Sequence, residues 1–391
     1  MDSPTPSDAD PTDPTDPGDA TDPTRVIDAV AGADADDESA SRRGVSRRTL
    51  TLIVSGVLLL VLVVLAATRP VPYVSIGPGP TFNTLGAYKD TALITVKGRP
   101  TYPTTGNLDL TTVTETGGPY GKLGLGEALR GWVDPHIAVV PTRLLYPDQQ
   151  TSAQIDQQNT ADFSGAESSA TVAAFQYLGI PVQRVVKVSS VTKGAPADGV
   201  LQKGDILVAI DGAKVASFTD ARTVIRTKSP GAKVTLTIKR NGKQQDVVVV
   251  PKSKLQNGKP VTIVGVTLGE DFDSPVIVKY GLTGVGGPSA GLMFSLGLVD
   301  KLTPGSLTNG AHIAGTGTID PAGKVGPIGG IQQKMQGARQ KGATIFLAPD
   351  SNCGDVRGAI PSGLRVVKVT TLTSAVQALD AIKAGKPTPT C

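Results

Sequence analysis

The chain has 391 residues, of which 39 % are hydrophobic and 4 % aromatic, enough for two or three domains that each bury a core. Residues 1–41 hold twelve acidic side chains and one arginine, so the net charge of +4 leaves the remaining body basic. There is no zinc-ligand spacing and no basic run with interleaved aromatics, which argues against nucleic acid as a partner.

Residues 1–48 are predicted to be a disordered acidic tail, because the repeat "DPTDPTDPGDATDPT" has almost no apolar side chain to bury. Residues 49–68 are predicted to be a transmembrane helix, since the 18 residues from Leu50 to Ala67 carry no charge and are apolar on every face. A buried helix or a cleaved signal peptide is the alternative. The long tail that precedes the segment disfavours a removed signal.

The arginines of "RRGVSRR" lie directly before this helix, and only Arg69 closely follows it. The positive-inside rule then places the N-terminus in the cytoplasm and everything after the helix outside the cell membrane. Both cysteines, Cys353 and Cys391, fall in that outer part. An oxidising compartment permits them to pair, but two separate thiols are equally compatible with the sequence.

The body reads as a mixture of strands and helices, which predicts an α+β fold. Strands are expected at 91–98 and 107–115, and helices at 125–133 and 168–177. From there to about residue 250, short strands alternate with one helix near 221–225, and "RNGK" is typical of a two-residue hairpin turn. This block of about 80 residues is long enough to be a domain by itself.

The segment "GAPADGVLQKGDILVAIDGAKV" within this block resembles the central part of a bacterial PDZ domain. The resemblance implies a groove in which an extended peptide adds to a strand edge. "YLGI", which is Tyr177, Leu178, Gly179 and Ile180, is similar to the loop that holds a peptide's free C-terminal carboxylate in such domains. Gly179 by itself is equally compatible with the C-terminal cap of a helix.

Ser289 lies in "GGPSAGLMFSLGLVD" and formally matches the G-x-S-x-G pattern of a nucleophile elbow. That interpretation needs a histidine later in the chain, and His312 follows after only 23 residues, within an expected strand. His136 precedes the serine. A Ser-His-Asp triad is therefore disfavoured, and both histidines are interpreted as structural residues.

A neutral lysine amine can activate a serine instead, provided that burial lowers its pKa. On a helix through "GGIQQKMQGARQKG", Lys334 shares one face with Ile331, Met335 and Ala338, whereas Lys341 stands at the helix end. Spacing alone leaves open that Lys334 is a lysine at the edge of a packed face with its amine in solvent.

"GGPSAG", followed 45 residues after its serine by the lysine of "GPIGGIQQK", resembles the proteolytic domain of the Lon family, which uses a Ser-Lys dyad. The resemblance implies that Ser289 is the nucleophile and Lys334 the base, with Thr316 supporting the dyad. The chain departs from the family at Gly286, where many members have Asp, and at Thr318, where they have Glu. It also lacks a phosphate-binding P-loop, which predicts no ATP requirement, and neither a cofactor nor a metal is expected.

Together these features resemble the membrane-anchored, PDZ-containing Lon-like proteases of Gram-positive bacteria. The expected organisation is a PDZ domain at 166–253 inserted in a Lon-type domain formed by 69–165 and 254–391. The predicted function is an outward-facing serine endopeptidase that acts on polypeptides, captured in part by their free C-termini, with membrane lipid as a further partner and a possible homo-oligomeric state. The rival interpretation is a catalytically inactive, membrane-tethered PDZ adaptor.

Overall fold

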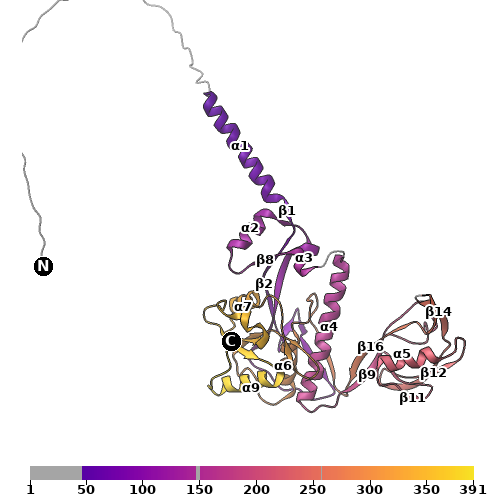
Figure 1. The fold of residues 1–391 in the computed structure, drawn as a ribbon. Coiled ribbons are helices and arrows are strands. Elements are labelled where there is room, and N and C mark those ends of the chain that lie inside the picture. The colour runs from indigo at the N-terminus through magenta and orange to yellow at the C-terminus, as the bar shows by residue number, and fades with distance from the viewer. Residues whose placement is uncertain (1–45, 147–149, 257) are drawn as a thin grey trace, which may run out of the picture. The chain divides into compact units, whose positions relative to one another are not determined.

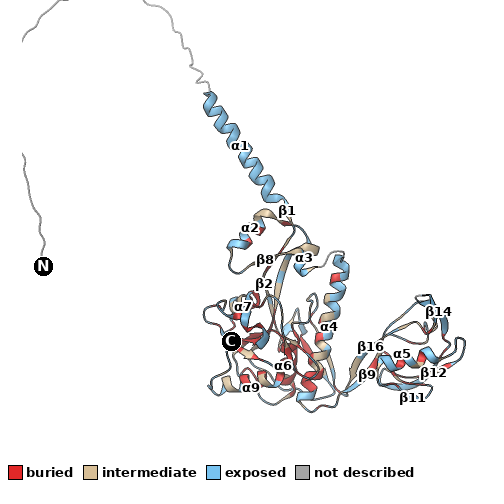
Figure 2. Ribbon diagram, viewed as in Figure 1, coloured by how far each residue is buried: buried red, intermediate tan, exposed pale blue. Residues whose placement is uncertain are grey.

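The computed structural model describes residues 46–146, 150–256 and 258–391, so most of the predicted acidic tail lies outside the described residues. The first element is helix α1 (Arg47–Thr68), with 22 residues and a mean hydropathy of 3.0 over its most apolar stretch. None of its side chains is buried (Figure 2). A helix of this length and composition is able to cross a bilayer.

A six-stranded mixed sheet forms the centre of the body (Figure 1). Parallel pairs join four of its strands, and two antiparallel pairs follow at the other end. In spatial order the strands are β22 (Arg365–Val369), β21 (Ile345–Pro349), β18 (His312–Gly315), β6 (Asn107–Gly117), β2 (Tyr73–Asn83) and β8 (Ala138–Pro141). Segments from both ends of the chain therefore build one sheet.

Helices cover both faces of this sheet, and strand alternation divides the core accordingly. Leu108, Ile313 and Leu347 contribute to one apolar cluster with α4 (Ser152–Tyr177), α6 (Gly291–Leu302) and α9 (Leu372–Lys383). Ala314 and Phe346 contribute to a second cluster with α7 (Ile331–Gln340) and α8 (Cys353–Val356). Figure 2 shows the buried residues concentrated around α6 and the sheet.

Short elements complete this part of the chain. Two-stranded pairs are formed by β1 (Pro70–Val71) with β7 (Leu123–Gly124), β3 (Ala87–Tyr88) with β4 (Thr91–Ala92), β5 (Ile94–Lys97) with β17 (Ile277–Tyr280), and β19 (Thr318–Ile319) with β20 (Val325–Gly326). The remaining helices are α2 (Leu125–Val133), α3 (Thr142–Leu145) and the single 3₁₀ turns Gly118–Tyr120 and Asp350–Asn352.

The block that resembles a PDZ domain has its own sheet and core. Its spatial order is β13 (Lys243–Val249), β12 (Val234–Arg240), β10 (Ile206–Ile210), β9 (Gln183–Val191) and β16 (Val266–Asp273), with β11 (Ala213–Lys214) on β10. Helix α5 (Phe218–Thr227) and the pair β14 (Lys252–Gln256) and β15 (Lys259–Ile263) lie beside it.

Local predictions in these regions are confirmed, and one of them falls short: residues 168–177 are helical and end at Tyr177 as expected, but their helix starts earlier. The helix expected at 125–133 is α2, and the hairpin turn at Asn241 and Gly242 has positive φ angles of 52° and 81°. The helix expected at 168–177 begins instead at Ser152, after Thr151. The Thr151 side chain accepts a hydrogen bond from the Gln154 backbone N–H and thereby caps the helix.

Cys353 and Cys391 form a disulfide, which settles the pairing that the sequence left open. It joins α8 to the last residue of the chain across 38 positions, and Cys391 packs against the cluster under α7. The cross-link therefore fixes the C-terminal segment beside the helix that carries Lys334.

Replacing both cysteines, as Cys353→Ser/Cys391→Ser, is expected to lower the free energy of unfolding by up to about 4 kcal/mol, because the unfolded chain regains the entropy of the closed loop. Urea unfolding of the detergent-solubilised protein, followed by circular dichroism, measures the difference. Dithiothreitol should reduce the stability of the wild type and leave the double variant unchanged. Equal stability of wild type and double variant would show that the bond constrains nothing.

Candidate active site and peptide groove

Ser289 stands at the end of a glycine-rich loop, directly before the N-cap residue of α6. Its backbone oxygen accepts hydrogen bonds from the Gly317 N–H at 2.9 Å and from the Thr316 hydroxyl at 3.1 Å. The Leu292 N–H donates in turn to the Gly317 oxygen at 3.0 Å. These bonds fix the serine backbone to the segment that follows β18.

Lys334 lies on the first half of α7, and its side chain is 3 % exposed. The helix face predicted from spacing is confirmed, because Ile331, Met335 and Ala338 are also buried. Gln333 is buried as well, so the packed face is wider than spacing suggested. Lys341 is exposed at the C-cap, as expected.

The structure brings the Lys334 amine to Ser289, with 2.7 Å between Nζ and Oγ. Nζ also donates to the Thr316 hydroxyl at 3.2 Å, and Thr316 is fully buried. Burial lowers the pKa of Lys334 from 10.5 to about 8. No carboxylate contributes to this shift, so desolvation alone brings the amine within reach of its neutral form near neutral pH.

Two glycines allow α7 to hold the lysine at this position. A Cβ at Gly337 would lie 2.8 Å from the backbone oxygen of Gly79 in β2, so only glycine permits this close helix–strand packing. Gly330, the N-cap residue, has a φ of 67°, which glycine adopts without strain. Lys334 is thus placed by backbone packing against β2.

Two cavities meet at the dyad. One, of about 610 Å³, is lined by strand β6 from Leu110 to Glu115 and by the loop from Thr283 to Gly287. The other, of about 500 Å³, is lined mainly by apolar residues including Ile76, Leu145 and Ile328. Both cavities include Val113, Glu115, Ser289 and Lys334 among their lining residues. A chain extended through both would pass over the serine.

Sequence reasoning missed a polar group beside these cavities. The Tyr146 hydroxyl donates to the Glu115 carboxylate, and burial, followed by Glu115, raises the pKa of Tyr146. Tyr120 stacks edge-on against Tyr146, and its hydroxyl accepts from the Asn159 amide at 3.0 Å. These residues come from four separate elements, and no local pattern marks them.

Gly286, where the Lon family often has Asp, has a packing reason in this chain. A Cβ at this position would lie 2.7 Å from the Cβ of Asn159 in α4. The Asn159 backbone oxygen also accepts from the Gly287 N–H at 3.0 Å. Helix α4 therefore supports the loop that leads to Ser289.

Neither histidine lines the two cavities at Ser289. His312 Nε2 lies 2.9 Å from the buried carboxylate of Asp109, which ties β18 to β6. His136 is exposed after α2, and its backbone N–H donates to Asp134. Among the described residues, no cluster of three His, Cys, Asp or Glu side chains could hold a metal ion.

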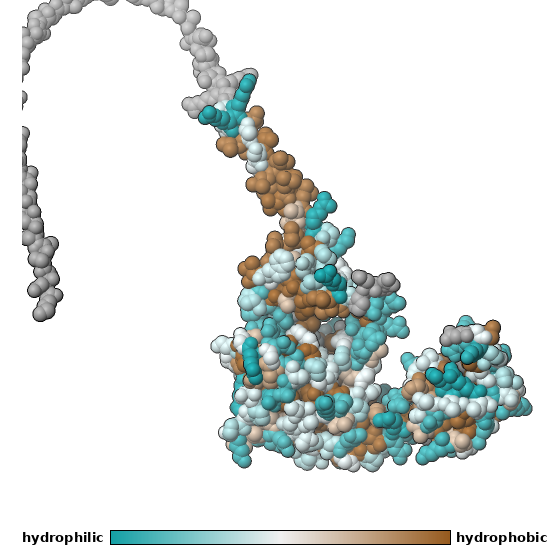
Figure 3. All heavy atoms as spheres, viewed as in Figure 1, coloured by the Kyte–Doolittle hydropathy of each residue, from teal (hydrophilic) through white to brown (hydrophobic). Residues whose placement is uncertain are grey.

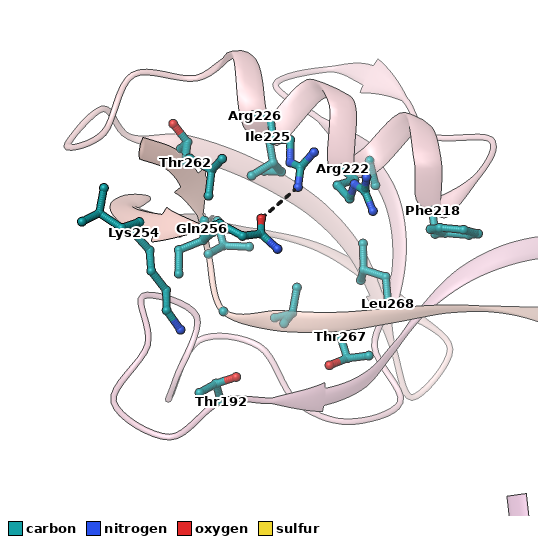
Figure 4. Close-up of a pocket in the computed structure, with 17 residues that line it drawn as sticks. Thr192, Phe218, Arg222, Ile225, Arg226, Lys254, Gln256, Thr262, Thr267 and Leu268 are labelled. Carbon is teal, nitrogen blue, oxygen red and sulfur yellow. Dashed lines mark hydrogen bonds between the residues drawn. The ribbon is translucent and has the colours of Figure 1, made fainter. Parts of the chain in front are cut away.

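A separate groove of about 510 Å³ lies between α5 and the edge strand β16 (Figure 4). Its apolar lining is joined by three cations, Arg222, Arg226 and Lys254, and its seventeen lining residues include no acid. Val264 and Gly265 form the loop before β16. Their backbone oxygens accept from Ala197 and Thr192, whereas in the described part of the chain their N–H groups donate no hydrogen bond.

The structure places Tyr177–Ile180 elsewhere, at the C-terminus of α4, and none of the four lines the groove. Gly179 has a φ of 66°, and the N–H groups of Gly179 and Ile180 donate to Gln176 and Phe175. This is a Schellman cap, and Ile180 and Phe175 share an apolar cluster. The helix-cap interpretation of Gly179 is the one that this geometry bears out.

Comparison with known proteins identifies two regions. Residues 162–250 match the PDZ domain family, and residues 262–382 match the Lon protease (S16) C-terminal proteolytic domain. The Lon match follows the PDZ match, so the expected insertion of one within the other is wrong for the Lon domain as its family defines it. Strands β2, β6 and β8 precede the PDZ match, yet they belong to the same sheet as β18, β21 and β22 of the Lon match.

Lon protease 1 of Bacillus subtilis is 35 % identical over 96 residues, which are 25 % of this chain and 12 % of that protein. The Lon protease of Neorickettsia sennetsu is 32 % identical over 112 residues, 29 % of this chain and 13 % of that protein. The chain thus spans about an eighth of the length of these relatives. The solved PDZ domain of the SdrC-like protein from Listeria monocytogenes is 30 % identical, covering 22 % of this chain and 86 % of that one, with a TM-score of 0.20. The chain therefore joins a PDZ domain to a Lon-type (S16) proteolytic domain, the domain of a Ser-Lys dyad peptidase family.

Proposed function

We propose that the protein is a membrane-anchored serine endopeptidase that cleaves extracytoplasmic polypeptides without ATP. The observation that carries this proposal is the 2.7 Å contact between the Lys334 amine and the Ser289 hydroxyl, made by a lysine with 3 % exposure. A lysine with its amine in solvent would be exposed, and a scaffold without activity would not require a desolvated cation beside a serine.

In the proposed reaction, neutral Lys334 accepts the proton of Ser289 Oγ as that oxygen attacks the carbonyl carbon of the substrate. The resulting ammonium then gives its proton to the leaving amine, and water releases the acyl group from the serine by the same proton path. Thr316 accepts from the Lys334 amine and donates to the Ser289 backbone, so it is a positioning residue for both.

The oxyanion would lie at the start of α6. In the described residues the backbone N–H groups of Ser289 and Ala290 donate no hydrogen bond. They precede a helix of 12 residues, whose positive dipole end favours the developing negative charge. Both groups are fixed before substrate arrives, because α6 is almost entirely buried.

An extended substrate would add to the free edge of β6. Strand β18 pairs with β6 only from Asn107 to Leu110, whereas β6 continues to Gly117. Residues Thr112 to Glu115 line the larger cavity, so their edge is open beside the dyad. Backbone pairing there would align a scissile bond independently of most side chains.

The outward orientation rests on two features. Four arginines lie before or in the first turn of α1, whereas only Arg69 closely follows the helix, which favours a cytoplasmic N-terminus. The disulfide between Cys353 and Cys391 is typical of an oxidising compartment.

The proposed reaction does not use ATP. No P-loop occurs in the 391 residues, and ATP is not available outside the membrane.

The groove between α5 and β16 would capture the free C-terminus of a polypeptide. A peptide added to the edge of β16 would direct its carboxylate at the N–H groups of Val264 and Gly265, with Arg226 and Lys254 nearby. The carboxylate site would then lie in the loop before β16, whereas the sequence predicted it at Tyr177–Ile180.

Ser289→Ala and Lys334→Arg should each reduce kcat/KM for an unstructured polypeptide to the background level, because the first removes the nucleophile and the second replaces the base with a guanidinium that stays protonated. Lys341→Arg is the matched control, since this exposed lysine lies at the end of the same helix. Cleavage is followed by mass spectrometry. An active, folded Lys334→Arg protein would refute the dyad, and unaltered cleavage by Ser289→Ala would favour the adaptor.

Lys334→Met should stabilise the protein, and the gain should shrink as the pH rises. Between about pH 8 and 10.5 the unfolded chain keeps a proton that folded Lys334 has released, so the free energy of unfolding of the wild type rises with pH. The difference between variant and wild type should therefore decrease by about 2 kcal/mol from about pH 7 to 10. Urea unfolding at several pH values measures it. A difference independent of pH would mean that Lys334 is not desolvated.

Peptides with a free C-terminus should bind the groove, and amidation should weaken them by about tenfold or more, which is about 1.4 kcal/mol. Fluorescence anisotropy with the Ser289→Ala protein measures affinity without cleavage. Arg226→Ala should weaken the free-terminus peptide, whereas Tyr177→Ala should not. The reverse pattern would return the carboxylate site to the end of α4.

A further inference from the structure

Helix α2 presents an apolar face to the outside of the body. Leu129, Trp132 and Val133 share one side of the helix and are 49 %, 55 % and 85 % exposed. The inward side consists of small residues, Ala128 and Gly131, both buried. A helix of a soluble body normally has the opposite arrangement, so this face calls for a covering environment.

The start of α2 is joined to the end of α1 by backbone contacts. Strand β1, two residues after α1, pairs with β7, which directly precedes α2. The Leu125 N–H donates to the Arg69 oxygen at 3.0 Å. A Cβ at Gly124 would lie 3.0 Å from the Ala67 oxygen, and one at Gly126 would lie 3.5 Å from the Ala67 Cβ. The last turn of α1 therefore contacts the first turn of α2.

The charge around α2 suits a lipid surface. Arg69, Lys122, Arg130 and Arg143 are exposed and form no ion pair among the described residues. The two carboxylates of the same region are engaged locally, since Glu127 accepts from the Gly124 N–H and Asp134 from the His136 N–H. Exposed cations flanking tryptophan and leucine are typical of segments that lie at the membrane–water interface.

We infer that α2 lies in the interface of the membrane that α1 crosses, with Leu129, Trp132 and Val133 among the lipid headgroups and upper acyl chains. The inference rests on the proposed anchoring by α1. Figure 3 shows hydrophobic surface over the part of the body that holds α2 and α3, where Leu144 is a further exposed apolar residue, at 71 %. The membrane is favoured over a partner protein because the chain itself holds this face beside the end of its membrane helix.

This contact would set the height of the active site above the bilayer. Leu145, next to Leu144, lines the apolar cavity that contains Ser289 and Lys334. Tyr146 follows and closes onto Glu115 at the junction of the two cavities. The segment from α2 to Tyr146 would thus connect the lipid surface with the catalytic cleft, which favours substrates cut close to the membrane.

Trp132 is the only tryptophan in the chain, so its fluorescence reports on α2 alone. The full-length protein is reconstituted into phosphatidylcholine–phosphatidylglycerol vesicles that carry bromine either near the headgroup or near the end of the acyl chain. Headgroup-proximal bromine should quench roughly half of the Trp132 emission, and deep bromine clearly less, as expected for an interfacial helix. Vesicle flotation after an alkaline wash tests α1 separately.

Leu129→Ser/Val133→Ser should lose most of this quenching, yet still float with the vesicles and cleave a soluble peptide at the wild-type rate. Val248→Ser/Val250→Ser is the matched control, because it removes two exposed valines from and beside β13 and should leave quenching unchanged. Absence of quenching in floating protein would overturn the interfacial position of α2 alone. Protein that fails to float would overturn the anchor, and quenching equal in the Leu129/Val133 variant and wild type would show that the apolar face plays no part.

Discussion

The proposed chemistry depends on the desolvation of the Lys334 amine. A lysine amine in water stays protonated near neutral pH and so cannot accept the serine proton. Burial lowers the pKa of Lys334 to about 8 and makes the neutral amine accessible. The surrounding structure keeps the lysine buried. Met335 and Ile331 pack beside it, and Gly337 allows α7 to pack against the backbone of β2. Among the described residues, Thr316 is the further polar partner of the amine. The fold thus keeps a costly cation in place because two hydroxyls receive its hydrogen bonds.

The site is assembled from segments on both sides of the PDZ match. Strands β2 and β6 come before it. Strand β2 supports α7, and β6 lines the larger cavity. The loop before Ser289, α6 and α7 come after it. Strand β16 forms one wall of the groove proposed to bind peptides, and the chain continues from β16 through β17 to the loop that carries Ser289. The proposed sites of capture and cleavage are therefore linked through a short stretch of backbone.

The sequence predicted those features that depend on local spacing. The bounds of α2, the Asn241–Gly242 turn and the buried face of α7 follow from periodicity and turn chemistry, and the structure has them. The contact between Ser289 and Lys334 was expected from resemblance to a family, because 45 residues of sequence separation carry no distance information.

Features that depend on distant segments were missed. "YLGI" has the pattern of a carboxylate loop, yet the same glycine geometry caps α4, and only the position of β16 distinguishes the two interpretations. Position 286 requires glycine because Asn159 of α4 packs against it. The hydrogen bond between Tyr146 and Glu115 joins two elements that are distant in sequence. The prediction also missed the first turns of α4. These turns are polar and lack the apolar periodicity on which helix prediction relies, although Thr151 and Gln154 form a capping box there.

The most direct test of a neutral lysine base is the pH dependence of kcat/KM for the wild-type protein, which reports ionisation of the free enzyme. If Lys334 accepts the serine proton, kcat/KM rises with pH in proportion to the neutral amine and levels off above about pH 8, the pKa that burial gives this lysine. A profile that levels off near the ordinary pKa of histidine, about 6.5, or that still rises steeply above about pH 10, would contradict the account.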